Sequence, residues 1–208
     1  MDIKSKTENF NQPKNTFSEG FSPDVRNKKE DQTENLNSKE KYNVDNKLDG
    51  FNSTRKERIE STPNETNPNG HWEGARGEGK FVVTNEEAKE ALSKFGLDGI
   101  PYKYGIPNFT PVSKGTVKID NMSGIRADNF KKGYEAMAEK WNEEKHEGQT
   151  NWDAQKVKQY KIDNKLDFHE CADGKTMQFV DHSIHIVCGH RGGRSEAAIK
   201  QGDNKYDK

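Results

Sequence analysis

The segment from Asp167 to Gly193 constrains this chain most, because it concentrates side chains that bind metals and transfer protons. It contains both cysteines and four of the six histidines of the 208-residue chain, namely His169, His182, His185 and His190. No other segment of the sequence has a comparable density of such groups. We therefore treat it as the candidate functional segment and the remaining residues as its support.

The local pattern of this segment predicts a strand, a turn, a second strand and a short helix. An extended run ends at Phe168-His169-Glu170, and Asp173-Gly174 favours a type I′ turn, whose two central positions both need positive φ. Met177–Val180 has the character of a second strand. Ser183–Val187 can form a helix that Gly189 ends. Folding of this unit would bring four side chains together: His169, Glu170, His185 and His190.

These residue types fit metal-assisted cleavage of a phosphodiester. Imidazoles suit zinc and nickel, whereas carboxylates suit magnesium and manganese, so we expect a divalent ion of one of these four kinds. Such an ion can hold a phosphate and stabilise a departing oxygen. A neighbouring histidine or glutamate can take a proton from water.

The motifs resemble a known group of nucleases. Phe168-His169-Glu170, the run Asp173–Val180, Ile184-His185 and His190-Arg191-Gly192-Gly193 together are similar to the HNH/endonuclease VII superfamily (His-Me finger, ββα-metal) nuclease domains of bacterial polymorphic toxins. Segments upstream extend the resemblance from about Trp72 to Ala198. It implies an α+β fold, with a ββα-metal core and additional helices. Phe168 in place of tryptophan, Asp181-His182 and Ile186-Val187 depart from the usual pattern, and none of these departures removes a presumed catalytic group.

The resemblance also implies roles for individual residues. His169, Glu170 and Gln178 are the expected catalytic residues, His185 and His190 the expected metal ligands, and Arg191 an expected contact to phosphate. Gln178 stands where the Asn of the HNH name falls. Two assignments remain open within the first pair: either His169 is a ligand and Glu170 the base, or His169 is the base and Glu170 a ligand or orienting group.

The implied activity is that of a metal-dependent endonuclease, with DNA favoured over RNA, acting as a bacterial toxin effector. Nucleic acid is the expected substrate, and the family implies a cognate immunity protein as a partner. An alternative is a non-catalytic structural zinc module, in which His169, Cys171, Cys188 and His190 supply two sulfurs and two nitrogens. A metalloprotease and a zinc deaminase are excluded, because His169-Glu170 lacks the further His or Cys residues that those sites need.

Composition limits how much of the chain can fold. Only 28% of residues are hydrophobic and 33% are charged, so one core for the whole chain is not expected. We predict a disordered linker arm over residues 1–70, a nuclease domain over 71–200 and a polar tail over 201–208. The net charge of -1 provides no overall positive field for nucleic acid.

The sequence shows no apolar run that would span a membrane and no signal peptide. We therefore expect synthesis in the cytoplasm, with export by a specialised system. Two cysteines do not make a disulfide framework. Cys171 and Cys188 could pair if the hairpin meets the helix, but the expected state is two free thiols beside the site.

The supporting elements follow from hydrophobic periodicity. Lys80–Val83 and Thr116–Asp120 are expected strands, and Ile100–Pro111 is an expected loop because it contains three prolines. A capping box of Thr84 and Glu87 is expected to begin a helix. Asp128 is expected to cap a second helix, whose apolar stripe comprises Phe130, Tyr134, Met137 and Trp141. Trp152–Tyr160 and Ser195–Ile199 are further expected helices, and His146 is expected to be exposed.

Overall fold

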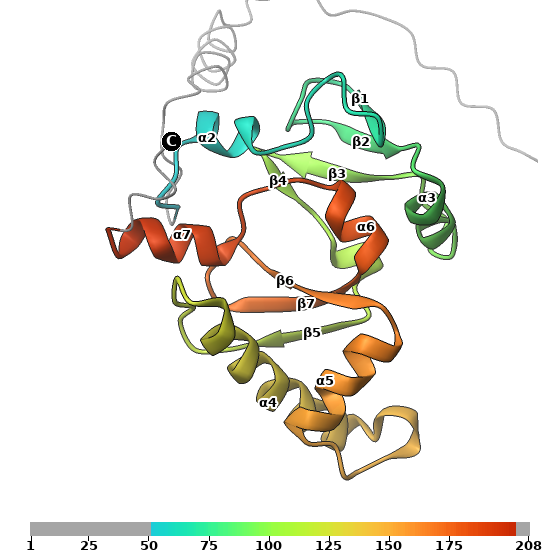
Figure 1. Ribbon diagram of the computed structural model, residues 1–208, viewed down its shortest axis with the longest axis vertical. Coiled ribbons are helices and arrows are strands. Elements are labelled where there is room, and N and C mark those ends of the chain that lie inside the picture. Colours follow the sequence, from blue (N-terminus) through green and yellow to red (C-terminus); the bar gives the residue numbers. More distant parts are fainter. Residues whose placement is uncertain (1–50, 203–208) are drawn as a thin grey trace, which may run out of the picture. The chain divides into compact units, whose positions relative to one another are not determined.

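The computed structural model describes residues 51–202, which all belong to one compact unit, Asn43–Lys208. Most of the predicted arm, residues 1–50, and residues 203–208 of the predicted tail lie outside the described range. Within this range the fold is α+β, as expected, with two antiparallel sheets and several helices (Figure 1). None of the helices in residues 51–202 has the length and apolar character of a transmembrane span.

The first sheet has four strands in the order β1-β2-β3-β4. They are β1 (Gly70–Glu73), β2 (Lys80–Val83), β3 (Gly99–Lys103) and β4 (Ile106–Pro107), with helix α3 (Glu86–Ser93) between β2 and β3. The predicted strand at 80–83 is confirmed. Strand β1 was not among the strands expected from the sequence.

The predicted loop over Ile100–Pro111 is wrong, since β3 and β4 form a hairpin there. Tyr104 and Gly105 connect these strands, and both have positive φ, at 56° and 77°, as a type I′ turn requires. Pro101 is accommodated because the ladder uses its carbonyl, which accepts from the backbone N–H of Asn108 at 2.9 Å. A 3-10 turn, η1 (Thr110–Val112), follows.

The second sheet carries the candidate segment. Its strands are β5 (Gly115–Lys118), β6 (Leu166–Glu170) and β7 (Thr176–Asp181), in the order β5-β7-β6. Helices α4 (Arg126–Glu144) and α5 (Ala154–Asp163) lie on one side of this sheet, and α6 (His182–Val187) lies on the other (Figure 1). The predicted strand-turn-strand-helix order is confirmed.

The turn between β6 and β7 differs from the predicted type I′ geometry. Gly174 has a φ of 69°, but Asp173 is not among the residues with positive φ. The Asp173 carboxylate instead accepts hydrogen bonds from the backbone N–H groups of Lys175 and Thr176, at 3.0 and 2.8 Å. Aspartate therefore shapes this turn by capping its backbone.

The sheet face that meets α4 and α5 contains an aromatic core. Phe168 and Phe179 are cross-strand partners whose rings stack at 4.1 Å. Met137 and Trp141 are buried beside them, and Phe130 and Tyr134 are partly buried, which confirms the predicted stripe. His146 is half-buried, contrary to expectation: it opens the 3-10 turn η2 (His146–Gly148) and stacks on Trp141 at 4.2 Å.

The residues predicted to cap two helices are wrong, although each lies within a few residues of the observed helix start. Asn85, and not Thr84, caps α3 by accepting from the backbone N–H of Ala88. Helix α4 begins at Arg126 after Ile125, so Asp128 lies within its first turn. Both helices therefore start near the predicted place, and their apolar faces are as expected.

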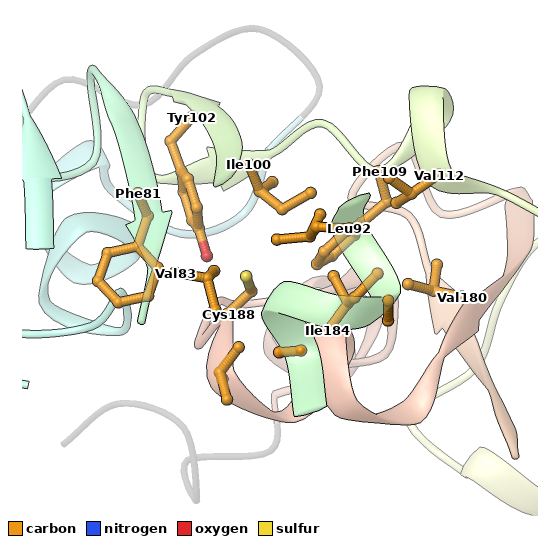
Figure 2. Packing of buried hydrophobic residues seen from close by; sticks show 13 residues of the cluster. Phe81, Val83, Leu92, Ile100, Tyr102, Phe109, Val112, Val180, Ile184 and Cys188 are labelled. Atoms are coloured by element: carbon orange, nitrogen blue, oxygen red, sulfur yellow. The ribbon is translucent and has the colours of Figure 1, made fainter. Parts of the chain in front are cut away.

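A second hydrophobic cluster joins the first sheet to the candidate segment. Leu92 from α3, Ile100 from β3, and Ile184 and Cys188 from the region of α6 pack together there (Figure 2). Phe109 belongs to the same cluster and is almost completely buried. This packing holds α6 between the two sheets.

Residues 51–63, which we call the N-terminal strap, are folded although the sequence placed them in the arm. The strap contains helix α2 (Arg55–Glu60), which begins with a complete capping box at Thr54 and Glu57. The buried carboxylate of Glu196, in helix α7 (Gly193–Lys200), accepts hydrogen bonds from Asn52 and Ser53. The predicted domain boundary at residue 71 therefore lies too far along the chain.

Candidate metal and phosphate site

Three of the predicted site residues meet in one cluster. His169, His185 and His190 each offer a ligand atom, and these atoms all lie within 4.8 Å of one another. The ring centroids of His169 and His190 are 4.7 Å apart, and those of His185 and His190 are 5.3 Å apart. Phe109 packs its ring edge-on against all three imidazoles.

Each histidine comes from a different local structure. His169 lies on β6 opposite Gln178 of β7, on the sheet face that α6 covers. His185 lies on α6, and His190 lies in the loop that follows it. The hairpin and helix predicted from sequence therefore do bring these three side chains to one point.

Hydrogen bonds set the orientation of two of the rings. Nδ1 of His185 lies 3.2 Å from a carboxylate oxygen of Asp167, and Nδ1 of His190 lies 2.7 Å from the carbonyl oxygen of Cys188. Since both partners are acceptors, each Nδ1 carries the proton. The Nε2 lone pair of each ring is left for another interaction, the usual arrangement for a histidine that binds a metal.

Two nitrogen atoms of the cluster lack hydrogen-bond partners, which fits a site for a metal ion. Nε2 of His185 and Nδ1 of His169 are buried and have no hydrogen-bond partner. A buried polar atom without a partner is costly unless a ligand completes it. Three imidazole ligands in this arrangement would leave open positions on an ion, as catalytic sites do.

The surroundings lower the pKa values of two of these histidines, His169 and His190. Burial and the neighbouring imidazoles lower the pKa of His169 well below its usual range. Burial and the nearby His185 lower the pKa of His190 to about 4. Burial alone would raise the pKa of Asp167, but its hydrogen bonds with His185 and His182 outweigh burial and hold it well below the usual range. His169 and His190 therefore favour the neutral imidazole that metal binding requires, and they lie near the ionised Asp167 carboxylate.

Glu170 lies on the other face of β6, because neighbouring residues of a strand point to opposite sides. Its carboxylate accepts a hydrogen bond of 2.7 Å from Asn129 of α4, and it lies 3.5 Å from Nε of Arg126. Burial raises the pKa of Glu170, and Asn129, Arg126 and Arg194 only partly oppose this. A carboxylate with a raised pKa is a better proton acceptor at neutral pH.

A pocket of about 240 Å³ joins Glu170 to the histidine cluster. Glu170, His185 and His190 line it together with two cations, Arg126 and Arg194. The side chain of Arg126 is 59% exposed whereas that of Glu170 is 5% exposed, so the arginine is open to solvent beside a buried carboxylate. The arrangement places a carboxylate, two imidazoles that could hold a metal ion and two guanidinium groups around one small cavity.

The other predicted site residues lie at the edges of this arrangement. Gln178 is buried next to His169 and donates to the Thr110 hydroxyl at 3.3 Å. Arg191 donates from Nε to the Ser61 hydroxyl, which links its loop to the N-terminal strap. His182 is exposed and lies outside the cluster, although its ring contacts Asp167 at 2.8 Å.

Neither cysteine joins the histidine cluster, so the predicted alternative ligand set of His169, Cys171, Cys188 and His190 is not assembled within residues 51–202. Cys171 directs its sulfur to Gln178, and Cys188 is fully buried in the hydrophobic cluster. Burial raises the pKa of both thiols to about 12, which disfavours the thiolate that binds zinc. Both are free thiols, as expected.

Sequence reasoning missed Asp167, Arg126 and Arg194. Asp167 lies two residues before His169 on β6, so the alternation of side chains along a strand could have placed both on the same face of the sheet. The two arginines stand far apart in sequence and meet only when α4 and α7 both approach the end of β6. No local signal pairs them.

Comparison with known protein families agrees with this geometry. Residues 99–192 match the family described as the DNase/tRNase domain of colicin-like bacteriocin. The match supports a nuclease toxin. It covers slightly less than half of the chain and includes the three histidines, Glu170 and Gln178. A comparison with curated proteins gives no match.

Proposed function

We propose that the protein is a metal-dependent endonuclease that hydrolyses phosphodiester bonds of nucleic acid, with DNA preferred over RNA. The observation that carries this proposal is the pocket that unites Glu170, His185 and His190 with Arg126 and Arg194. The similarity to colicin-like nuclease domains supports the same reaction class.

In this proposal His169, His185 and His190 hold the ion, and Asp167 orients His185. A bound divalent ion supplies Lewis-acid chemistry, by polarising the phosphate and stabilising the departing oxygen. Strands β6 and β7 and helix α6 would then be the ββα-metal core of an HNH-type site. Magnesium, manganese, zinc and nickel are the candidate ions.

Of the two assignments that the sequence left open, we propose the one in which Glu170 is the general base and His169 a metal ligand. Glu170 is separated from the cluster by strand alternation yet lines the same pocket, so it can take a proton from water while His169 remains a ligand. Asn129 holds the carboxylate in place through a 2.7 Å hydrogen bond.

Arg126 and Arg194 line the pocket, and in this proposal their guanidinium groups bind the phosphate. Gln178 would brace the β7 side of the site through Thr110. Arg191, a contact to phosphate in the sequence-based hypothesis, would contribute by holding its loop against the strap.

The toxin interpretation carries two further proposals. A nuclease of this kind needs a cognate immunity protein in the producing cell, and we propose that one binds this chain. We also propose export by a specialised system, so that the nucleic acid of another cell is the target.

The test is cleavage of plasmid DNA and of total RNA by purified protein, in EDTA and after adding back each of the four ions. Cleavage that depends on the ion and is lost in His169→Ala and Glu170→Gln is expected. His71→Ala is the matched control, because His71 lies on exposed β1 and outside the cluster. Cleavage unaffected by EDTA, or equal in all variants, would contradict the proposal.

A further inference from the structure

A second cavity, lined by two aromatic side chains and two lysines, lies between α4 and α5. Its volume is about 370 Å³. Phe130, Lys131 and Tyr134 line it from α4, and Gln155 and Lys158 line it from α5. We call this cavity the α4–α5 groove.

The groove adjoins the catalytic pocket. Phe168, which lines that pocket, contacts both aromatic rings of the groove, with centroid distances of 5.5 Å to Phe130 and 5.1 Å to Tyr134. The guanidinium of Arg126, also in the pocket, lies over the Phe130 ring at 5.8 Å. One arginine and one phenylalanine therefore connect the phosphate-binding side of the pocket to the groove.

The aromatic rings are only partly buried. Phe130 and Tyr134 pack one side against the sheet core and leave the other accessible, whereas Lys131 and Lys158 are exposed. Partly exposed rings flanked by cations are the means by which proteins bind single-stranded nucleic acid, because every base has a π-face and every nucleotide a phosphate.

We propose that the α4–α5 groove holds an unstacked base of the nucleotide next to the scissile phosphate. Phe130 and Tyr134 stack on the base, and Lys131 and Lys158 neutralise the adjoining phosphates. A base in a continuous duplex cannot enter the groove while it remains stacked, so the preferred substrate is a single-stranded or locally opened stretch. This inference rests on the proposed nuclease function and specifies its substrate class.

Binding is tested in EDTA, so that no substrate is cut. Fluorescence anisotropy compares a labelled 12-nucleotide single strand of DNA, the same strand of RNA, and the blunt DNA duplex, for the full chain and its variants. Phe130→Leu and Tyr134→Leu keep an apolar side chain against Phe168 but remove the stacking surface. Each is expected to weaken single-strand binding about 5- to 100-fold, the range for losing one stacked base. Thermal denaturation shows whether the variants remain folded.

Charge reversal provides a second variant that does not disturb the core. Lys131→Glu/Lys158→Glu is expected to weaken single-strand binding and to lower its salt dependence, by about 0.7 in the slope of log K against log salt for each lost contact. Lys89→Glu/Lys94→Glu is the matched control, because it makes the same charge change at two exposed residues elsewhere, Lys89 on α3 and Lys94 at its C-cap.

The outcomes separate the groove from the catalytic proposal. Equal binding of duplex and single strand would overturn the proposed base-binding role of the groove. An equal loss of binding in the control variant would also overturn it. A change in oligomeric state in the Phe130 or Tyr134 variants would do the same. Metal-dependent cleavage with an unchanged KM in these variants would overturn the groove and leave the nuclease intact. Stacking-dependent binding without cleavage of any substrate would support the groove and contradict the nuclease.

Discussion

One carboxylate oxygen of Asp167 lies 3.2 Å from Nδ1 of His185 and 2.8 Å from Nδ1 of His182, so two imidazoles share it. Only His185 belongs to the histidine cluster. The carboxylate thus fixes the ring of one proposed ligand from behind, while His182 competes for the same oxygen from the surface.

Asp167→Asn is expected to weaken metal binding by about 10- to 100-fold, the usual effect of removing a carboxylate that orients a ligand histidine. Calorimetric titration with zinc or nickel measures it. Asp163→Asn makes the same charge change at the end of α5 and should leave the affinity unchanged. His182→Ala should also leave the metal affinity unchanged. A loss of affinity in His182→Ala comparable to that in Asp167→Asn would show that the effect is not specific to His185.

Glu170→Gln is expected to slow cleavage by about 10²- to 10⁴-fold, the contribution of a general base, with metal affinity retained. His169→Ala is expected to lose both cleavage and metal affinity. Metal titration and single-turnover kinetics on the same preparations decide between the two assignments. Loss of metal in Glu170→Gln, with retention in His169→Ala, would reverse the roles.

The metal-free protein is expected to lose stability as the pH falls from about 6.5 to about 4. The unfolded chain binds protons at its histidines near pH 6.5, whereas the folded His190 has a pKa of about 4 and that of His169 is also lowered. Because the unfolded state then holds more protons, acid favours unfolding. The raised pKa of Glu170 acts in the opposite direction.

Urea denaturation at a series of pH values measures this dependence, and His190→Gln isolates the contribution of one ring. The variant should show a shallower fall of unfolding free energy between pH 6.5 and pH 4 than the original chain. Parallel curves would show that His190 does not stay neutral in the folded state.

Cys171→Ser and Cys188→Ala are both expected to keep metal binding and cleavage. Cys188→Ala should cost about 1 kcal/mol of stability, since it removes a buried sulfur from the core (Figure 2). Metal content after dialysis and thermal denaturation check both statements. Loss of a bound zinc in either variant would revive a structural zinc site.

A chain that starts at residue 71 is expected to unfold at lower urea than one that starts at residue 51. Removing the strap leaves the buried Glu196 carboxylate without Asn52 and Ser53, which costs at least about 2 kcal/mol. It also removes the carbonyl of Pro63 that accepts from the Trp72 indole at 2.9 Å. Equal urea midpoints for the two chains would show that the strap is dispensable.

The candidate site was predictable where its determinants are local. The extended run that ends at Glu170, the Asp173-Gly174 turn signal and the strand character of Met177–Val180 indicated β6 and β7. The helix expected over Ser183–Val187 corresponds to α6, which carries His185. The different surroundings of His169 and Glu170 were not predictable, because α4 supplies Asn129 and Arg126 to Glu170 from a distant part of the chain.

The strap and the β3–β4 hairpin were missed for two different physical reasons. The strap is stabilised by buried polar side chains, such as Arg58 bonded to the carbonyls of Tyr104 and Ser53, and a hydrophobicity pattern does not show such a network. The hairpin contains Pro101 and Pro107, which argue against strands, and its turn places Tyr104 at a φ of 56°, where tyrosine is uncommon.

The opposite orientation of His169 and Glu170 on β6 has a consequence for how such enzymes can diverge. The proposed ligand and the proposed base are neighbours in sequence but face separate environments, one shaped by α6 and the other by α4. Substitution of the base can therefore alter the chemistry without disturbing the metal, and substitution of the ligand can alter metal preference without moving the base. Inserting a single residue into β6 would exchange the two environments and abolish both roles at once.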